Sequence, residues 1–329
     1  MVGMVSDTTP ASQAAWDHAQ MVAGITSWTI CSVGMMVFNK LAINAFPLEC
    51  TLVAMQMLCT VLAMLIFQWR QIHIGSLRDA LQWSIVIPFF VGMLLTSILA
   101  LKTAPMTLVV TLRVLSPLVS LGIERFYPNP LRVSPAMFAS IFGMFLGTSM
   151  YVTKMDDKNW NGIMWVFLNI ILAVGDRLLQ RLMLAKDQYP VDISIPGLTL
   201  LNNFLGMLPI CVAVWWTDEL HKIPATMASL SGLGAVWVVA SCIVGVGISY
   251  CGIWAQSLIS ATSFMVLVNV NKFAIVLLEV FVIRTRKPHP LQVAGAIVAI
   301  LSGVAYGRAR EAIQKRCQEQ EFEKSGIPG

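Results

Sequence analysis

Two asparagines and a lysine interrupt a long apolar segment in the last third of the chain. Residues 261–283 read ATSFMVLVNVNKFAIVLLEVFVI, with Asn269, Asn271 and Lys272 near the middle. About 20 apolar residues suffice to span a bilayer as a helix, so Lys272 is expected near the membrane midplane. A cation at that depth costs about 2.5–3.5 kcal/mol and usually faces a polar interior. Lys272 is therefore predicted either to bind an anionic ligand or to pair with a carboxylate on another helix.

Helical periodicity separates the polar residues of this segment. At 100° per residue, one face combines Thr262, Met265, Asn269, Lys272, Val276 and Glu279. Asn271 lies off that face. The pattern predicts that Asn271 bonds a neighbouring helix, or that the backbone is locally unwound there.

A second deep cation follows a similar pattern. The segment MTLVVTLR ends at Arg113, and MVLVNVNK ends at Lys272, an offset of 159 residues. One helical face is predicted to carry Arg113, Ser116, Pro117, Ser120 and Glu124. Two buried cations are unstable together, and an anion with two or more charges, such as a diphosphate, would stabilise them. The alternative is an ion pair of Arg113 with Asp176 or Glu124.

Asn202 and Asn203 are adjacent in the middle of a third apolar segment, 195–216. A side-chain amide offers two donors and an acceptor, which is enough to read the edge of a base. Hydrogen bonding between helices is the other common role of asparagine in membranes. Because adjacent residues point to different faces, one structural amide and one ligand-reading amide is a reasonable expectation.

The composition indicates an all-α polytopic membrane protein. Of the 329 residues 57% are hydrophobic and only 12% are charged, about half the charged fraction of a soluble domain. Ten transmembrane helices are predicted, at residues 21–43, 48–68, 81–101, 106–123, 133–152, 160–183, 195–216, 234–255, 261–283 and 291–307. Basic residues are scattered over short loops, so the lipid bilayer and not a nucleic acid is the expected partner.

The chain also resembles itself. PNPL at 128–131 aligns with PHPL at 288–291 at nearly the same offset along the chain as Arg113 and Lys272, with one extra residue. The offset corresponds to five spans, which inverts the second copy in the membrane. Two inverted five-helix repeats are therefore predicted, at 21–152 and 153–310. Chance similarity between apolar helices is the alternative.

The remaining features set the orientation and limit the chemistry. The tails, 1–20 and 311–329, are predicted to be cytosolic because Lys and Arg favour the cytosolic side of the predicted spans. This assignment counts Arg177 and Arg181 as cytosolic, because they lie in the inner end of the predicted span 160–183 and their long side chains can extend to the cytosol. The four histidines are dispersed, so no metal site and no cofactor are expected. The seven cysteines lie mostly in apolar runs, which argues against a disulfide framework.

Several of these segments carry a family resemblance. LVNVNK at 267–272 resembles the Gly-x-Leu/Val-Asn-Lys motif of GDP-sugar transporters, and LLNN at 200–203 resembles their Phe-Tyr-Asn-Asn motif. FNK at 38–40 and ISYCGIW at 248–254 are similar to further motifs of the family in the same order. The chain thus looks like a GDP-mannose-type nucleotide-sugar transporter of the drug/metabolite transporter superfamily.

The resemblance implies an antiporter and not an enzyme. It would import GDP-mannose or a related GDP-sugar into the Golgi lumen in exchange for GMP, by alternating access. Its partners would be a nucleotide sugar and a nucleoside monophosphate, and a homodimer is left open. Substrate contacts are expected from Asn202, Asn203, Ser249, Asn269, Asn271, Lys272 and Arg113. Among these, the two adjacent amides would read guanine, and Asn271 with Lys272 would bind sugar and phosphate.

The sequence departs from the family pattern at three positions near these motifs. Val268 replaces a glycine of the motif, and Trp28 and Phe264 stand where the family has tyrosines. A UDP-sugar or sugar-phosphate antiporter of the same superfamily is therefore an alternative. A membrane enzyme acting on a phosphate-bearing substrate is a more distant one, for which the adjacent Asp156 and Asp157 are the candidate carboxylate pair.

Overall fold

The computed structural model describes residues 10–124, 134–153, 160–184, 190–258 and 289–325, together with positions 264, 267, 268, 271, 272, 275 and 278. Within these residues the regular structure is helical, and eight helices are long and apolar enough to cross a membrane. The expected all-α polytopic membrane protein is thereby confirmed. The count of ten spans stays a prediction, since the span at 261–283 lies largely outside the described residues.

The long helices follow the predicted order of the spans. They are α1 (Pro10–Ala45), α2 (Glu49–Phe67), α4 (Ile87–Thr103), α7 (Pro135–Thr153), α8 (Trp160–Leu184), α9 (Ile195–Trp216), α11 (Gly232–Leu258) and α13 (Pro290–Ser325). The short helices are α3 (Leu77–Ser84), α5 (Met106–Arg113), α6 (Ser116–Glu124) and α10 (Glu219–Ser229), with a 3-10 turn, η1, at Trp69–Gln71. Both α1 and α13 continue into the segments predicted as tails.

The predicted span at 106–123 is not one continuous helix. It breaks between α5, which ends at Arg113, and α6, which begins at Ser116. Pro117 explains the break, because a proline has no N–H to donate to the carbonyl four residues earlier, that of Arg113. The single helical face predicted for this span is therefore interrupted just after its cation.

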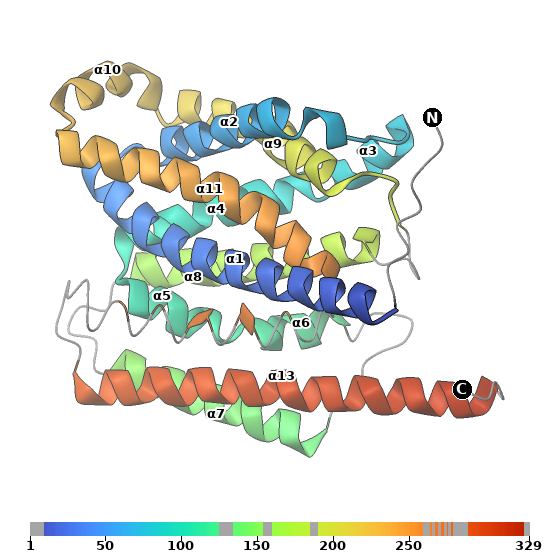
Figure 1. Cartoon of the computed structure of the whole chain (residues 1–329). Coiled ribbons are helices and arrows are strands. Elements are labelled where there is room, and N and C mark those ends of the chain that lie inside the picture. The colour runs from blue at the N-terminus through green and yellow to red at the C-terminus, as the bar shows by residue number, and fades with distance from the viewer. Residues whose placement is uncertain are drawn as a thin grey trace, which may run out of the picture.

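The helices pack in four main pairs, which Figure 1 shows as nearly aligned neighbours. The pairs are α1 with α11, α2 with α9, α4 with α8, and α7 with α13. The last pair forms the lower layer of the view, and α5 and α6 lie between it and α8. Segments far apart in the sequence thus form every principal interface.

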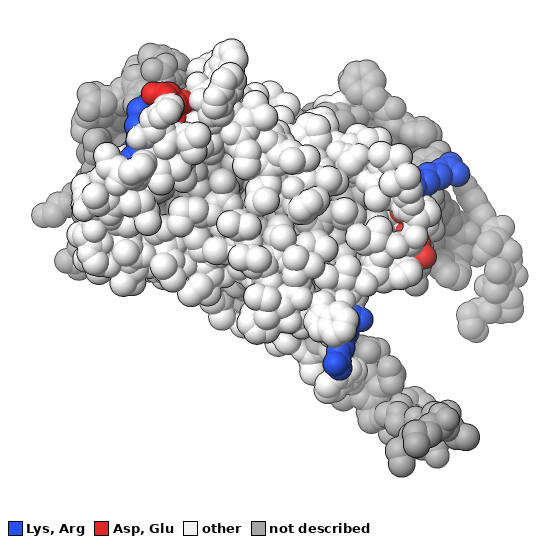
Figure 2. All heavy atoms as spheres, turned by 90° about the horizontal axis from the view of Figure 1, so that it is seen from above, with Lys and Arg blue, Asp and Glu red and all other residues white. Residues whose placement is uncertain are grey.

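The outer surface is apolar along the length of the helices. On α7, Phe138, Phe142 and Phe145 are all more than half exposed, at the spacing of one helical face. In Figure 2 most of the visible surface belongs to uncharged residues, and the few Lys, Arg, Asp and Glu atoms gather toward its margins. A continuous apolar surface of this kind suits contact with lipid acyl chains.

A buried carboxylate fixes one helix end. The carboxylate of Glu219, at the start of α10, accepts hydrogen bonds from Thr51 N (2.8 Å), Thr51 Oγ1 (2.8 Å) and Cys50 N (3.1 Å). These N–H groups belong to the first turn of α2, which has no intrahelical acceptors for them. The negative charge also stabilises the positive end of the helix dipole.

Candidate functional site

A cavity of about 290 Å³ lies between the helices, and six of the seven predicted site residues line it. These six residues are Arg113, Asn202, Asn203, Ser249, Asn271 and Lys272. They come from α5, α9, α11 and the partly described segment that follows α11. The seventh, Asn269, lies outside the described residues. The sequence therefore predicted which side chains the fold brings together.

The break after α5 provides the main described contact of Lys272. The Lys272 ammonium donates to the carbonyl oxygen of Arg113 at 2.9 Å. Ser116 Oγ donates to the same oxygen at 2.5 Å. That oxygen is available because Pro117 cannot donate to it. Arg113 and Lys272 are thus joined by a hydrogen bond from the Lys272 ammonium to the Arg113 main chain.

The Arg113 guanidinium also remains directed to polar groups in the cavity wall. Its Nη2 donates to Ser97 Oγ at 2.9 Å. Its Nε is buried and has no hydrogen-bond acceptor within the described part of the chain. Among described residues no ion pair joins Arg113 to Asp176, and the side chain of Glu124 lies outside them. An anion in the cavity would therefore find an unused donor here.

Asn271 connects the segment of Lys272 to α1. Its Nδ2 donates to Ser32 Oγ at 2.6 Å, which is the neighbouring-helix bond that the sequence offered as one option. Its Oδ1 is buried without a partner among the described residues. Both Asn271 and Lys272 line the cavity, although Asn271 lies off the helical stripe that contains Lys272. Consecutive helical residues diverge by only about 100°, and a cavity that wraps around the helix reaches both.

The side-chain amides of Asn202 and Asn203 use different ends in their hydrogen bonds to the protein: Asn202 uses its oxygen and Asn203 its NH₂ group. The indole N–H of the buried Trp83 donates to Asn202 Oδ1 at 2.7 Å. Asn203 Nδ2 donates to the carbonyl of Thr199, one turn earlier on α9, at 2.8 Å. Asn202 is thus left with its donor group, and Asn203 with its acceptor, for the cavity that both line. Both amides have structural bonds as well as access to a ligand.

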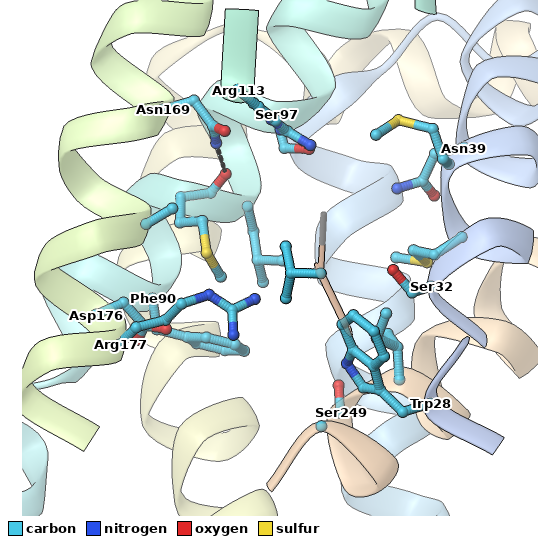
Figure 3. Close-up of a pocket in the computed structure, with 18 of the residues that line it drawn as sticks. Trp28, Ser32, Asn39, Phe90, Ser97, Arg113, Asn169, Asp176, Arg177 and Ser249 are labelled. Atoms are coloured by element: carbon cyan, nitrogen blue, oxygen red, sulfur yellow. Dashed lines mark hydrogen bonds between the residues drawn. The ribbon is translucent and has the colours of Figure 1, made fainter. Parts of the chain in front are cut away.

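Trp28 of α1 and Ser249 of α11 form another part of the wall (Figure 3). The Trp28 ring packs against Phe264, with ring centroids 4.9 Å apart. Both side chains are almost completely buried, at 4% exposure each. The two positions at which the sequence lacks the family's tyrosines are therefore in contact, and of the two Trp28 lines the cavity.

Two charged residues of α8 were not predicted to belong to the site. Asp176 and Arg177 both line the cavity, and Figure 3 shows the Arg177 guanidinium pointing into it. The prediction that Arg177 extends to the cytosol is therefore wrong, because its guanidinium carbon lies over the Phe264 ring, 5.0 Å from the centroid. The Asp176 carboxylate accepts from Gln180 Nε2 at 3.0 Å to each oxygen. Three polar residues within one turn of an apolar span were the sequence signal for this part of the site.

A neutral network extends the polar wall toward α2. Gln56 Nε2 donates to Asn39 Oδ1 at 2.9 Å and to Ser241 Oγ, and Ser241 Oγ donates to Asn39 Oδ1 at 2.8 Å. On the α8 side, Asn169 donates to the carbonyl of Met93 at 2.7 Å. Asn39, Gln56 and Asn169 line the cavity from three different helices, whereas Ser241 bonds Asn39 and Gln56 without lining it. Only the fold brings these isolated polar positions together.

Lys40, which lies within the predicted span 21–43, does not belong to the cavity. Its ammonium donates to the carbonyl oxygens of Leu101 and Ala104, at 3.2 Å for Ala104. These carbonyls end α4, where a cation also interacts favourably with the helix dipole. Lys40 is not among the residues that line the cavity, and its described contacts are those of a helix cap.

The charges that line the cavity do not balance. Among the described lining residues, Arg113, Arg177 and Lys272 are cationic and Asp176 is the one carboxylate, which leaves an excess of two positive charges. Such an excess in a site of low dielectric favours a bound anion. Amides that present a donor and an acceptor lie in the same cavity. The arrangement suits a ligand that combines phosphate with a hydrogen-bonding ring.

Comparison with known proteins gives relatives over most of the chain. A comparison with protein-family models found no match. The chain is 27% identical over 297 residues to GDP-fucose transporter 1 of Arabidopsis thaliana, covering 86% of this chain and 84% of that protein. It is 24% identical over 319 residues to GDP-mannose transporter GONST3 of the same plant, covering 92% and 84%. It is 23% identical over 318 residues to the GDP-mannose transporter of Kluyveromyces lactis, covering 89% and 92%.

A solved crystal structure supports the fold. It matches with a TM-score of 0.51 at 18% sequence identity, over 89% of this chain and 97% of the other. The curated relatives are named as transporters and not as enzymes, as the motifs predicted. The chain is therefore similar, over most of its length, to curated proteins named as transporters of GDP-fucose and GDP-mannose.

Proposed function

We propose that this protein is a GDP-sugar transporter, which moves GDP-mannose or a related GDP-sugar across the Golgi membrane in exchange for GMP. The observation that carries the proposal is the central cavity, which combines an excess of two positive charges with the oriented amides of Asn202 and Asn203. Relatives named as transporters of GDP-mannose and GDP-fucose support the same substrate class.

The amide pair is suited to guanine. Asn202 offers a donor for an acceptor such as guanine O6, and Asn203 offers an acceptor for the ring N–H beside it. Arg113 and Lys272 would bind phosphate and Asn271 the sugar, and Ser249 lines the same cavity. In the absence of a ligand, Arg113 Nε and Asn271 Oδ1 are the buried groups that such a substrate would satisfy.

We propose further that the transporter consists of two inverted five-helix repeats. A two-fold axis would relate each predicted span to the span five places later in the chain. Such an axis would place α2 beside α9 and α7 beside α13. It would also superpose the α1–α11 pair on the α8–α4 pair. These are the four principal packing pairs. The bond from Lys272 to Arg113 also joins two residues that the repeat aligns, as expected where such an axis passes. Alternating access would then exchange the roles of the two halves.

Reconstituted transport tests this proposal. Proteoliposomes loaded with GMP should take up labelled GDP-mannose faster than empty ones, because the two ligands share base and phosphate contacts. Equal uptake by empty vesicles would contradict exchange. Competition by GMP but not by UMP or inorganic phosphate is expected; the reverse would favour a UDP-sugar or sugar-phosphate antiporter. GDP-fucose should be tested beside GDP-mannose, since relatives are named for each sugar.

Orientation and organelle belong to the same proposal. The distribution of Lys and Arg along the sequence supports cytosolic termini, with the nucleotide sugar entering from the cytosol. Protease accessibility of terminal tags in sealed Golgi vesicles would test this orientation: both tags should be cleaved without detergent, and protection of either would contradict it.

A further inference from the structure

The third cation of the cavity is held differently from the other two. Lys272 donates to a main-chain carbonyl, and Arg113 donates to the Ser97 hydroxyl. Arg177 instead lies over the face of Phe264, at 5.0 Å from the ring centroid. Phe264 in turn is held by its packing against Trp28. A buried aromatic pair thus supports this guanidinium from one side.

Contact through a face leaves the edges of a guanidinium available. The five N–H donors of arginine lie in its plane, whereas an aromatic ring contacts the flat surface. Figure 3 shows the Arg177 guanidinium reaching into the cavity from α8, with Ser32, Asn39 and Trp28 of α1 across from it. The planar fork matches two oxygens of a phosphate group, a geometry that a lysine does not offer.

The neighbouring carboxylate, Asp176, attracts this group but forms no ion pair with it among the described residues. Asp176 precedes Arg177 on α8, but both of its oxygens accept from the Gln180 amide, and no ion pair between Asp176 and Arg177 occurs among the described residues. Repulsion from both Arg113 and Arg177 acts on the Lys272 ammonium. Three cations that repel one another call for a ligand with more than one negative group.

We propose that Arg177 binds the second phosphate of a nucleoside diphosphate, and so distinguishes diphosphate ligands from monophosphates in this cavity. The inference rests on the proposed function and adds a specificity-determining residue to it. Arg113 and Lys272, which are joined through one carbonyl, serve the phosphate next to the nucleoside. Arg177, on the separate wall formed by α8, serves the phosphate that carries the sugar. GMP lacks that second phosphate and leaves Arg177 unused.

Binding measurements on Arg177→Gln test this division. The affinities of purified full-length protein for GDP, GMP and guanosine are measured from the rise of the melting temperature with ligand concentration. GDP affinity should fall roughly tenfold or more, the effect of one lost charge-assisted hydrogen-bonded pair, while GMP affinity changes by less than about threefold. Arg177→Lys keeps the charge and loses the fork, so its loss of GDP affinity should be intermediate.

Arg70→Gln is a matched control. Arg70 also lies over a tryptophan, 5.3 Å from the ring centroid of Trp69, but it is exposed and outside the cavity. This variant should bind GDP and GMP as the wild type does. If Arg177→Gln does not fold, Phe264→Leu removes the ring and keeps the cation, and it should weaken GDP binding without changing GMP binding.

The outcomes separate the inference from the proposed function. Equal losses of GDP and GMP affinity in the Arg177 variants, or no loss of either, would overturn the role of Arg177 and leave the transporter proposal in place. A wild-type protein that binds no guanine nucleotide would overturn the proposed function itself, and with it the role of Arg177.

Discussion

The bond between Trp83 and Asn202 allows a sharp test of base recognition. Trp83 is completely buried and its indole N–H lies 2.7 Å from Asn202 Oδ1. The substitution Trp83→Phe keeps an aromatic ring but removes the donor. The Asn202 amide would then be free to turn and present its oxygen where its NH₂ group now faces the cavity.

Two effects of different size are expected from this substitution. An Asn202 oxygen left buried and unpaired costs about 1–3 kcal/mol of folding free energy, in addition to the volume lost from the core. Losing the orientation of one neutral hydrogen bond to a ligand is worth about 1 kcal/mol, or roughly fivefold in GDP affinity. The variant should therefore be less stable and should also bind GDP several times more weakly.

A double-mutant cycle separates these effects. GDP affinity is measured for wild type, Trp83→Phe, Asn202→Ala and the double variant, again from ligand-dependent melting. If Trp83 acts only by orienting Asn202, Trp83→Phe should not weaken GDP binding further once Asn202 is alanine. Trp216→Phe, at a tryptophan 81% exposed on the same helix as Asn202, is the control and should be neutral.

The reasoning would be refuted by an additive cycle, in which Trp83→Phe weakens GDP binding by the same factor with or without the Asn202 side chain. It would also be refuted if the single variant bound GDP as the wild type does.

Three further predictions concern other described contacts. Lys272→Gln should reduce GDP-mannose exchange by at least about tenfold while the protein still folds, because a phosphate loses its charged partner; exchange at the wild-type rate would exclude Lys272 from the site. Glu219→Gln should lower the free energy of unfolding by about 1.5–3 kcal/mol in denaturant titrations and leave GDP affinity unchanged, since its three bonds cap α2 away from the cavity. Lys40→Met should lower the melting temperature by removing the cap of α4, and an unaltered melting curve would show that the two carbonyl contacts contribute nothing.

The sequence predicted the elements of the site better than their geometry. Lys272 and the adjacent asparagines are conspicuous because polar residues in the middle of an apolar span must find polar surroundings. Pro117 was equally visible, and its position four residues after Arg113 could have predicted both the break and the available carbonyl.

Other features depend on contacts between distant segments. Arg177 lies near the end of its span, where a long side chain can reach water, and only the position of Phe264 shows that it turns inward. Asn39, Gln56 and Ser241 form one network from three helices, and no spacing in the sequence relates them. A periodicity argument also treats a cavity as a narrow stripe, so it separates Asn271 from Lys272 although both line the cavity.

The carbonyl of Arg113 lowers the cost of burying the Lys272 ammonium when no ligand is bound. Its oxygen accepts a hydrogen bond from the Lys272 ammonium and so takes the place of a ligand's phosphate. A main-chain dipole, however, offers only a fraction of a full negative charge. In the proposed function, an arriving phosphate would compete with that dipole and not with bulk water. When the ligand leaves, the ammonium would return to an acceptor that is part of the backbone. Lys272 would therefore keep a hydrogen-bond partner in the ligand-free protein.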